Sequence, residues 1–404
     1  MIKSKLIPHY NKPRLIINMI PEKIKLLYLI PSLYAPGGME RILTNKINHL
    51  VGTGKYDVSI MTTDQMEKPN YFFLDKRVNT IHLNLNFNMF FNYNLIKKYL
   101  ETKKLLKLYN SKLKNFIIEN KIDICISLGG KELEFLSSLD VNCKKICEIH
   151  FAKDIRKQFL IARKNSLLNN FIGTLRTKQL IYQTKKLDKL IVLTKKDKQD
   201  WINTNKNVEQ IYNFSFIETK SQSNFKNKKA IAIGRLDSQK GFDMLIDAWA
   251  EIKEYNKDWK LEIYGQGEWE NKLKEKIAKK KVENIELKGS TNEIENKLLE
   301  SSLYLCSSRY EGFPLVLLEA ISCGLPIVSF DCPQGPAEII ENNISGILVE
   351  KENIEQFAEK LTDIIRNEDL RMMMGNNAKN KSQEFSKSKI MEEWENLFES
   401  LVNI

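Results

Sequence analysis

The chain has few residues that could cross-link it or hold a metal ion. Its 404 residues include six cysteines and four histidines. Cys143 and Cys147 have a C-x3-C spacing with no second pair, which is poor support for a zinc site. No Asp-x-Asp motif occurs, so a metal ion held by paired aspartates is not expected. We therefore expect no cofactor and no metal, with the cysteines reduced and mostly buried.

Long apolar runs are also missing. Lys, Pro or Asn interrupts each apolar stretch well before the roughly 18 residues that a membrane-spanning helix needs. Residues 1–22 form a leader extension with scattered cations, and they lack the apolar region and cleavage site of a secretory signal. No solenoid-type repeat is present. The expected location is therefore cytoplasmic, with no transmembrane helix and no export.

The apolar residues that are present, 42% of the chain, suffice for two domains. Short buried strands alternate with longer helical patterns, which indicates two Rossmann-like, doubly wound α/β domains. The predicted boundaries are an N-terminal domain over 1–212, a polar linker over 213–229, a C-terminal domain over 230–385 and an amphipathic final helix over 386–404.

Two carboxylates, Glu311 and Glu319, bracket a loop that leads directly into an apolar helix. Pro314 suits the first turn and a Gly-x-Pro sequence follows, so the helix is predicted over about 315–323. Glu319 is the single charge on this helix, and a buried carboxylate needs polar partners. Counted along the chain, the two carboxyl groups lie on the order of 10–15 Å apart. That is too far for a glycosidase acid/base pair and suits two ends of one elongated ligand.

This segment resembles the E-x7-E signature of retaining glycosyltransferases of family 4, the glycosyltransferase group 1 enzymes with the GT-B fold. In that family the first Glu and the amides of the following loop contact the donor sugar, and the second Glu holds the ribose hydroxyls. By resemblance the donor-binding residues here are Glu311, Gly312, Phe313, Pro314, Leu315 and Glu319. In isolation the two glutamates could be a solvated loop residue and an ion-paired one, but the surrounding loop, helix and strand favour the resemblance.

The sequence GRLDSQKG at 234–241 forms a second motif. An apolar strand ends at Gly234, and helical spacing restarts at Phe242. Two cations beside a helix N-terminus can offset the charge of a pyrophosphate, and Arg235 and Lys240 are the candidates. The alternative is that both are ordinary surface cations in a chain with 63 Lys and Arg. The family has the same pattern, with its Arg and Lys on the donor diphosphate.

Gly37 and Gly38 lie between a predicted strand over 24–30 and a helix. Paired glycines at such a junction let backbone amides approach a phosphate, although they also suit a plain tight turn. The family has a glycine-rich loop here that closes on the donor, so both residues are assigned to donor binding by resemblance.

His150 ends an apolar strand over 145–150, and ligands gather at strand ends in open α/β sheets. The alternative is a histidine that is merely hydrogen-bonded within the fold. By resemblance it lies near the donor sugar, and with Glu311 it forms the predicted catalytic set. No residue is an obvious covalent nucleophile.

Charge is divided unevenly along the chain. Residues 1–217 contain 37 Lys and Arg against 18 Asp and Glu, a balance of +19, and the remainder contains 26 against 33, a balance of −7. Cations concentrate over 153–198, including Arg156, Lys157, Arg163 and Lys164, and an aromatic segment lies at 87–93. An anionic membrane surface is the favoured partner. A nucleic acid and a merely solvated surface are the alternatives, and no nucleic acid is expected.

The resemblance therefore implies a metal-independent, retaining GT-B glycosyltransferase whose domains face a central cleft and whose last helix crosses back to the first domain. It also implies that the N-terminal domain binds the acceptor and that the C-terminal domain binds the nucleotide sugar. The donor would be a nucleotide-diphosphate sugar, with a UDP-sugar favoured over GDP-mannose. The acceptor would be a glycan or lipid-linked molecule of bacterial surface polysaccharide or glycoconjugate synthesis. A sugar-nucleotide epimerase of the same fold and a catalytically silent carbohydrate- or membrane-binding protein are the alternatives.

Overall fold

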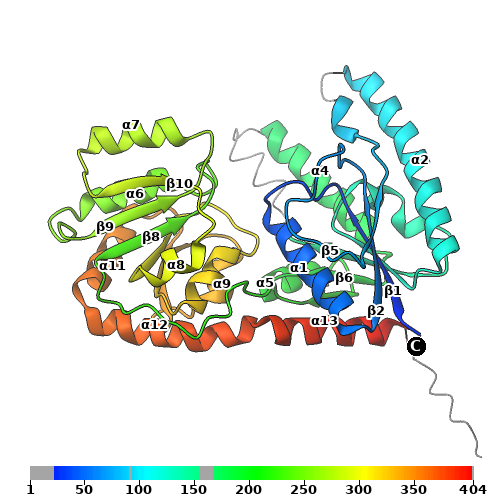
Figure 1. Ribbon diagram of the computed structural model, residues 1–404. Helices are drawn as coiled ribbons and strands as arrows, with labels where there is room; N and C mark the ends of the chain where they lie inside the picture. The colour runs from blue at the N-terminus through cyan, green and yellow to red at the C-terminus, as the bar shows by residue number, and fades with distance from the viewer. Residues whose placement is uncertain (1–21, 91–92, 154–166, 403–404) are drawn as a thin grey trace, which may run out of the picture.

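The chain folds into two lobes, each built on a parallel sheet with helices packed against it (Figure 1). The computed structural model describes residues 22–90, 93–153 and 167–402. The first lobe has seven strands in the order β3-β2-β1-β4-β5-β6-β7, and the second has six in the order β10-β9-β8-β11-β12-β13. This arrangement confirms the predicted pair of doubly wound sheets.

The strands of the first sheet are β1 (Ile24–Ile30), β2 (Tyr56–Thr62), β3 (Asn79–His82), β4 (Ile124–Ser127), β5 (Lys144–Ile149), β6 (Lys189–Val192) and β7 (Val208–Gln210). The helices of this lobe include α1 (Gly38–Thr53), α2 (Leu95–Asn120), α4 (Leu167–Thr184) and α5 (Lys195–Ile202). The strands of the second sheet are β8 (Lys229–Ile233), β9 (Lys260–Tyr264), β10 (Ile285–Gly289), β11 (Leu303–Cys306), β12 (Ile327–Asp331) and β13 (Gly346–Glu350). The helices that follow in the chain include α6 (Phe242–Glu251), α7 (Glu270–Lys280), α8 (Ile294–Leu299), α9 (Leu315–Ser322), α10 (Pro336–Ile339), α11 (Ile354–Arg366), α12 (Glu368–Ser382) and α13 (Lys387–Val402).

The central strand of the first sheet is apolar on both faces. Leu26 and Tyr28 of β1 pack into a core with α1 and α13, whereas Leu27 and Leu29 pack into a core with α2, α4 and α5. Successive strand residues point to opposite faces, so a continuous apolar run is what a sheet covered on both sides requires. The same alternation occurs in β11 of the second sheet, where Leu303 and Tyr304 belong to different cores.

Strand order reverses at one point in each sheet. In the first lobe the chain leaves β1 toward β2 and β3 and returns on the other side at β4, and in the second lobe β8 and β11 have the same relation. Loops at the carboxyl ends of such neighbouring strands diverge and leave a crevice. The fold therefore provides one crevice in each lobe before any particular side chain is considered.

Helix α13, drawn in red along the lower edge of Figure 1, runs back under the first lobe after the chain has completed the second. Six of its apolar side chains recur at helical spacing and are buried in the first lobe's core, namely Ile390, Met391, Trp394, Leu397, Phe398 and Leu401. Full burial of such a side chain contributes roughly 1.5–3 kcal/mol. This packing confirms the predicted return of the last helix to the first domain.

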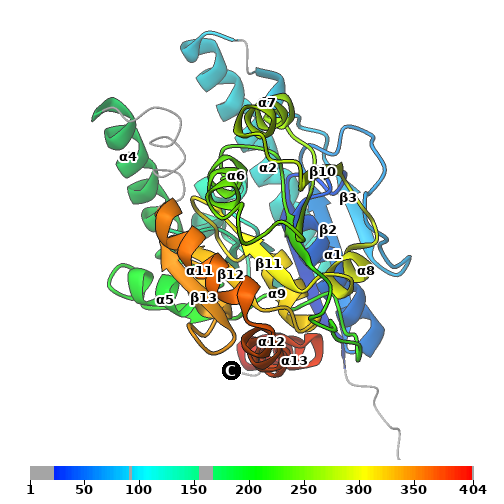
Figure 2. The same cartoon turned by 90° about the vertical axis from the view of Figure 1, so that its left-hand side faces the viewer.

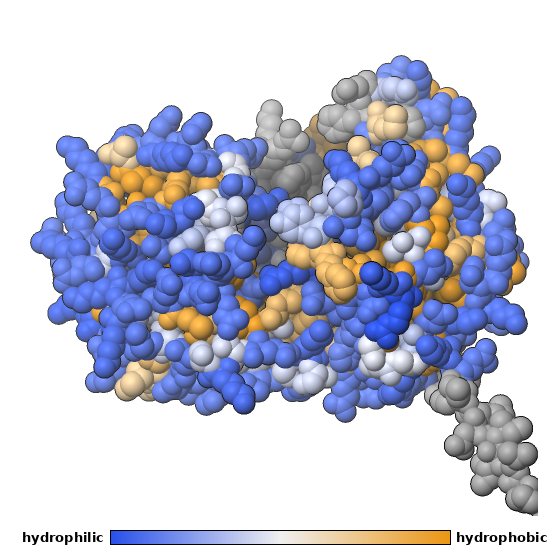
Figure 3. Space-filling view, viewed as in Figure 1, coloured by the Kyte–Doolittle hydropathy of each residue, from blue (hydrophilic) through white to orange (hydrophobic). Residues whose placement is uncertain are grey.

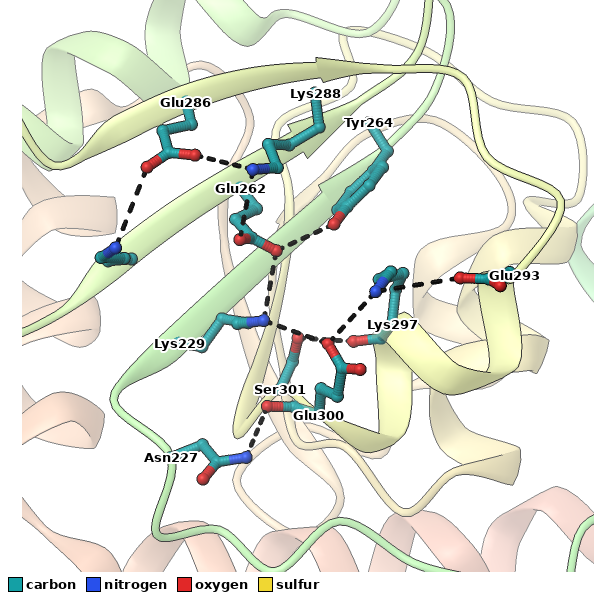
Figure 4. A network of polar contacts seen from close by, with 11 residues as sticks. Asn227, Lys229, Glu262, Tyr264, Glu286, Lys288, Glu293, Lys297, Glu300 and Ser301 are labelled. Atoms are coloured by element: carbon teal, nitrogen blue, oxygen red, sulfur yellow. Dashed lines mark hydrogen bonds and ion pairs between the residues drawn. The ribbon is translucent and has the colours of Figure 1, made fainter.

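A polar network crosses one edge of the second sheet (Figure 4). Lys229 of β8 lies 3.3 Å from Glu262 of β9 and 3.3 Å from Glu300 beyond α8. The Tyr264 hydroxyl donates to Glu262 at 3.0 Å, and Lys288 of β10 pairs with its own strand neighbour Glu286 at 2.8 Å. The network connects α8 to the strands, and it lies apart from the cavity described below.

Hydrophilic side chains cover most of both lobes on the face seen in Figure 3. Among the described residues no helix combines the length and apolarity that crossing a membrane requires. The chain passes from the first sheet to the second over residues 211–228. The domain boundaries at 213–229 and 386 stay predictions. Residues 1–21 of the predicted leader lie outside the described residues. The predicted membrane-contacting cations Arg156, Lys157, Arg163 and Lys164 lie outside them too.

Candidate functional site

A cavity of about 570 Å³ lies where loops of the two lobes meet. The first lobe contributes to it from α1, α4 and the end of β5, and the second contributes from the loops after β8 and β11. Its lining residues are Gly38, His150, Phe151, Arg176, Arg235, Gln239, Tyr310, Glu311, Gly312 and Phe313. Residues from motifs far apart in the sequence therefore converge at one place.

Glu311 is held by two donors at this cavity. Glu311 is 5% exposed. Its Oε1 accepts a hydrogen bond from Lys240 Nζ at 2.7 Å and another from Ser308 Oγ at 2.6 Å. Burial lowers the pKa of Lys240, but the neighbouring Glu311 carboxylate outweighs this effect and leaves that pKa raised. Lys240 is thus a charged partner of Glu311. The hydrogen bonds from Lys240 and Ser308 both end on Oε1, so they leave Oε2 of Glu311 unoccupied.

The turn before α6 places Lys240 for this contact. Gly241 has a φ of +62°, and a Cβ at this position would lie 2.1 Å from the Ser307 carbonyl oxygen, so glycine is required for the backbone to approach β11. The Asp237 carboxylate accepts from the backbone N–H groups of Gln239 and Lys240 at 3.0 and 3.2 Å. A short polar turn between strand and helix therefore sets the position of the basic motif.

Arg235 differs from Lys240 in its surroundings. Its side chain is 73% exposed, lines the cavity and lies 3.3 Å from Asp237. The turn therefore directs one cation onto Glu311 and leaves the other on the cavity wall.

Glu319 lies on α9 and is 1% exposed. Arg41 of α1 donates from Nη1 to Glu319 Oε1 at 2.7 Å, which makes an ion pair between the lobes. Burial raises the pKa of Glu319, against the opposing effect of Arg41. The other oxygen, Oε2, is buried without a hydrogen-bond partner among the described residues. The sequence predicts that this carboxylate needs polar partners. Among the described residues, Oε1 has such a partner and Oε2 does not.

Glycines allow the two lobes to approach closely beside the cavity. A Cβ on Gly312 would lie 2.7 Å from the His150 carbonyl oxygen, and one on Gly38 would lie 3.0 Å from Leu315 Cδ1. Both contacts join the first lobe to the loop and helix that contain the two glutamates. Gly37 is the N-cap residue of α1 and does not line the cavity.

His150 follows β5 and belongs to a buried charged group. Its Nε2 lies 2.9 Å from Glu148 Oε1, and Lys46 Nζ of α1 donates to the same oxygen. Glu148 and Lys46 are each 1% exposed, and Lys46 Nζ lies 3.6 Å from the centroid of the Trp394 ring of α13. Burial raises the pKa of Glu148, but Lys46 and His150 outweigh it and lower the pKa to about 2. His150 is therefore positioned by an ionised carboxylate that the last helix helps to cover.

The structure separates the predicted site residues into two sets. Six line the cavity, namely Gly38, His150, Arg235, Glu311, Gly312 and Phe313. Five do not, namely Gly37, Lys240, Pro314, Leu315 and Glu319, although Lys240 and Glu319 make the ion pairs given above. Pro314 is the N-cap of α9 rather than a residue of its first turn.

Sequence reasoning did not assign Phe151, Arg176, Gln239 or Tyr310 to the site, yet all four line the cavity. Gln239 and Tyr310 adjoin the recognised motifs, so their nearness in sequence was a usable signal. Arg176 had none, because it is one of many cations spread over residues 153–198 and no motif surrounds it. Within the described part of the chain no cluster of three or more metal-binding side chains occurs.

Comparison with known proteins identifies the family. The model of the family "Glycosyl transferases group 1" matches residues 213–381. An uncharacterised glycosyltransferase of Haemophilus influenzae is 31% identical over 380 residues, with 92% of this chain and 99% of that protein covered. The chain belongs to the glycosyltransferase group 1 family. The sequence left three classes open, namely a glycosyltransferase, a sugar-nucleotide epimerase and a catalytically silent binding protein. Membership of this family selects the glycosyltransferase.

Two further comparisons extend over nearly the whole chain. The amylovoran biosynthesis glycosyltransferase AmsD of Erwinia amylovora is 28% identical, with 92% of this chain and 99% of that protein covered. The crystal structure of a Staphylococcus aureus TarM mutant, solved with Fondaparinux, alpha-GlcNAc-glycerol and UDP, superposes with a TM-score of 0.71 at 20% identity. It covers 93% of this chain and 100% of that one. The likeness confirms the predicted GT-B fold.

Proposed function

We propose that this group 1 glycosyltransferase transfers a sugar from a UDP-sugar to a glycan or lipid-linked acceptor of bacterial surface polysaccharide or glycoconjugate synthesis. The observation that supports this most directly is the cavity between the lobes, where His150, Arg235 and Glu311 meet. GDP-mannose is the second choice of donor. The TarM structure contains UDP, which supports a UDP-sugar as the donor. The name of AmsD, an amylovoran biosynthesis glycosyltransferase, is the support for a biosynthetic role.

The donor sugar would lie against Glu311 and the backbone amides that follow it. Lys240 and Ser308 hold Oε1 of Glu311, so Oε2 is the oxygen offered to sugar hydroxyls. His150 would contact the sugar from the first lobe. Its Nε2 lies 2.9 Å from Glu148 Oε1, so an ionised carboxylate of the same lobe stands beside the ring.

The nucleotide would bind next to the sugar along the second lobe. The unpartnered Oε2 of Glu319 would accept hydrogen bonds from the ribose hydroxyls. These bonds would give a buried polar atom the partner that it otherwise lacks. Arg235 and Lys240 would offset the negative charge of the diphosphate as it leaves. A metal ion is not needed for that charge balance in this proposal.

Transfer would retain the anomeric configuration. In a same-face route the bond between the sugar and the diphosphate breaks, the acceptor oxygen bonds to the same face of the anomeric carbon, and a phosphate oxygen takes the acceptor proton. Glu311 binds hydroxyls and is not assigned as a nucleophile, because Lys240 and Ser308 already hold its Oε1 and its Oε2 is assigned to the sugar hydroxyls. UDP leaves with the proton.

Donor binding tests the proposed pocket. We expect Glu319→Ala and Lys240→Ala each to weaken UDP-sugar binding by roughly 2–4 kcal/mol, because each removes a charged contact from a buried setting. Isothermal titration of the folded variants with a panel of UDP- and GDP-sugars measures this. Lys274→Ala, which removes an exposed lysine of α7, is the matched control and should leave affinity unchanged. Unchanged affinity in a folded Glu319→Ala and Lys240→Ala double variant would refute the assignment.

Product analysis tests the chemistry. Excess EDTA should leave the rate of UDP release intact, because the charge of the diphosphate falls on Arg235 and Lys240. The product should keep the donor's anomeric configuration, which proton NMR coupling constants determine. Loss of turnover that added Mg²⁺ or Mn²⁺ restores, or an inverted linkage, would contradict the proposal.

We also propose that the first lobe contacts an anionic membrane surface. Of the twenty large hydrophobic residues that are exposed in the described chain, nine lie on α2 and α4, among them Ile96 at 75% and Tyr182 at 72%. These two helices rise at the same end of the lobe in both Figure 1 and Figure 2. A groove on α2 combines Ile96 and Leu100 with four lysines, namely Lys97, Lys103, Lys104 and Lys107. Apolar side chains among cations are typical of surfaces that bind anionic lipid.

A further inference from the structure

The chain crosses between the lobes twice. The first crossing follows β7 over residues 211–228, and the second lies at 383–386, between α12 and α13. Both run along the lower edge of the molecule in Figure 1. Three aromatic rings meet where these crossings approach the second sheet, namely Tyr212 of the first crossing, Phe385 of the second and Phe313 of the loop after β11. Of the three, Phe313 lines the cavity between the lobes.

The ring of Tyr212 is stacked on the ring of Phe313. Their centroids lie 5.5 Å apart and their planes are inclined by 24°. Phe385 packs edge-on against Tyr212, with the centroids 5.1 Å apart, and its ring centre lies 6.0 Å from that of Phe313. Aromatic pairs in these arrangements are stabilised beyond the burial of their area. The position of Phe313 is therefore set by one ring from each crossing.

The hydroxyl end of Tyr212 is held as well. It donates to Glu338 Oε2 at 2.8 Å, and Glu338 Oε1 accepts from the N–H of Lys196 at 3.0 Å. Lys196 lies in the first turn of α5, where N–H groups have no partner within the helix. Burial and the Glu338 carboxylate raise the pKa of Tyr212, so its hydroxyl remains a donor at neutral pH. One carboxylate of the second lobe thus joins a helix of the first lobe to the ring that contacts Phe313.

The backbone beside Phe313 is enclosed on two other sides. Gly312 approaches the His150 carbonyl oxygen so closely that a Cβ there would lie 2.7 Å from it. Gly335, with a φ of +107°, lies on the opposite side, where a Cβ would lie 2.5 Å from Pro314 Cδ and 3.2 Å from the Gly312 carbonyl oxygen. The loop that follows Glu311 is therefore confined by the first lobe, by the loop before α10 and by the ring of Tyr212.

We propose that Tyr212 is a positioning residue for donor binding, because its ring, stacked on Phe313, holds the loop after Glu311 in place for the sugar. Tyr212 itself does not line the cavity and acts through Phe313. Since the backbone amides of this loop are the groups proposed to contact the donor sugar, this role rests on the proposed function. Tyr212 should affect binding of the sugar and leave binding of the nucleotide, whose proposed contacts lie elsewhere, unchanged.

Isothermal titration of the full chain with UDP, UDP-glucose and UDP-N-acetylglucosamine tests this role. Tyr212→Leu removes the ring, and we expect affinity for the preferred UDP-sugar to fall about tenfold while UDP affinity stays within about twofold of the parent value. Tyr212→Phe keeps the stacked ring and should stay within about twofold for both ligands. Tyr255→Leu, at a tyrosine that is 52% exposed, is the matched control and should change neither affinity.

Hydrogen exchange of the ligand-free chain is a second measurement, and it needs no donor. In Tyr212→Leu the loop after Glu311 and the first turn of α9 should exchange about tenfold faster, whereas β1 and β8 should exchange as in the parent chain. In Tyr212→Phe and Tyr255→Leu the loop should exchange at the parent rate. If no protein binds UDP or either UDP-sugar, the proposed donor is refuted, and exchange of the loop alone decides the role of Tyr212.

Four results would overturn the positioning role. The first is an equal rise of exchange in every segment of Tyr212→Leu, which would show that the ring serves stability alone. The second is parent-like exchange of the loop in that variant. The third is an equal loss of affinity for UDP and for the UDP-sugar, and the fourth is a loss in Tyr212→Phe as large as that in Tyr212→Leu.

Discussion

At the scale of single residues, the two glutamates of the signature motif differ in how they are satisfied. Glu311 accepts from Lys240 and Ser308 within its own lobe, whereas Glu319 accepts from Arg41 of the other lobe. A nucleotide that binds Glu319 would therefore meet a carboxylate already in contact with the first lobe. If Glu319 holds the nucleotide as proposed, its ion pair with Arg41 connects the nucleotide position to the approach of the lobes.

Glu148 gives a residue-scale prediction that concerns His150. Replacing Glu148 by Gln leaves Lys46 buried and unpaired, and we expect the free energy of unfolding to fall by about 3–5 kcal/mol. Burial lowers the pKa of Lys46 in the folded protein and Glu148 opposes that effect, so without Glu148 this pKa falls further. The unfolded chain then binds more protons than the folded one, and the stability of the variant rises with pH more steeply than that of the parent chain. The deficit of Glu148→Gln should therefore shrink between pH 7 and pH 10, as chemical denaturation can measure.

A second variant separates the fold from the site. Lys46→Met combined with Glu148→Gln removes both charges and should regain most of the lost stability. Its kcat should remain low, because His150 still lacks its carboxylate partner. Glu286→Gln, at a carboxylate that is 42% exposed, is the matched control and should change neither quantity. Normal kcat in the double variant would show that Glu148 serves stability alone.

The candidate site was predictable at residue scale where a motif is continuous in sequence. Glu311, Arg235 and Gly312 lie on the cavity because strand-to-helix loops bring them to one sheet edge. The pairs Arg41–Glu319 and Lys46–Glu148 were not predictable, because they join residues 278 and 102 positions apart. No local pattern encodes which cation reaches which carboxylate across such distances.

At the scale of secondary-structure elements, α5 forms a polar contact between the lobes. Glu338 of α10 accepts from the N–H of Lys196 at 3.0 Å and from the Tyr212 hydroxyl at 2.8 Å. Gln334 donates to Asp200 at 3.1 Å. The first turn of α5 thus contacts the second lobe directly, and a change in that turn affects how the lobes are held.

Asp197 of α5 gives an element-scale prediction. It is 3% exposed, and burial raises its pKa to about 6, so the folded protein binds its proton more tightly than the unfolded chain does. Its contribution to stability is present at pH 4 and is lost as the pH rises to about 6, by on the order of 3 kcal/mol.

Asp197→Asn removes this titration while keeping a side chain of similar shape. The melting temperature of the variant relative to the parent chain should therefore be higher at pH 7 than at pH 4.5, as differential scanning fluorimetry can measure. Asp258→Asn, at a carboxylate that is 75% exposed, is the control and should show no such dependence. An equal difference at both pH values would contradict the assignment.

Helices and strands could be predicted from the sequence where the spacing of apolar residues alone defines them. Helix α13 followed from four apolar residues at helical spacing, and the strands followed from short apolar runs between polar turns. Which face of which sheet α13 covers was not encoded in that periodicity. It depends on Trp394 packing against Lys46, which is a contact between distant parts of the chain.

At the scale of the whole molecule, the two crevices and the exposed helices of the first lobe lie in a consistent arrangement. The cavity between the lobes and a cavity of the first lobe that Asp64, Gln179 and Gln183 help to line share Arg176 on α4. Helix α4 also contributes four exposed apolar side chains, namely Leu168, Phe171, Leu175 and Tyr182. A membrane that α2 and α4 touch would therefore lie close to both cavities. This arrangement suits an acceptor whose saccharide part enters the lobe from a lipid surface.

The last prediction concerns that surface. We expect the full chain to float with liposomes that contain anionic phosphatidylglycerol and to float less at 1 M salt, where charges act over about 3 Å instead of about 8 Å. Lys103→Glu with Lys107→Glu reverses two cations of the α2 groove and should release the protein at physiological salt. The matched pair Lys272→Glu and Lys279→Glu, on exposed positions of α7, makes the same change in net charge and should still float. If both pairs behave alike, the attraction comes from net charge and α2 has no specific role. If the parent chain ignores anionic vesicles even at low salt, the basic surface is only solvated and the acceptor is a soluble glycan.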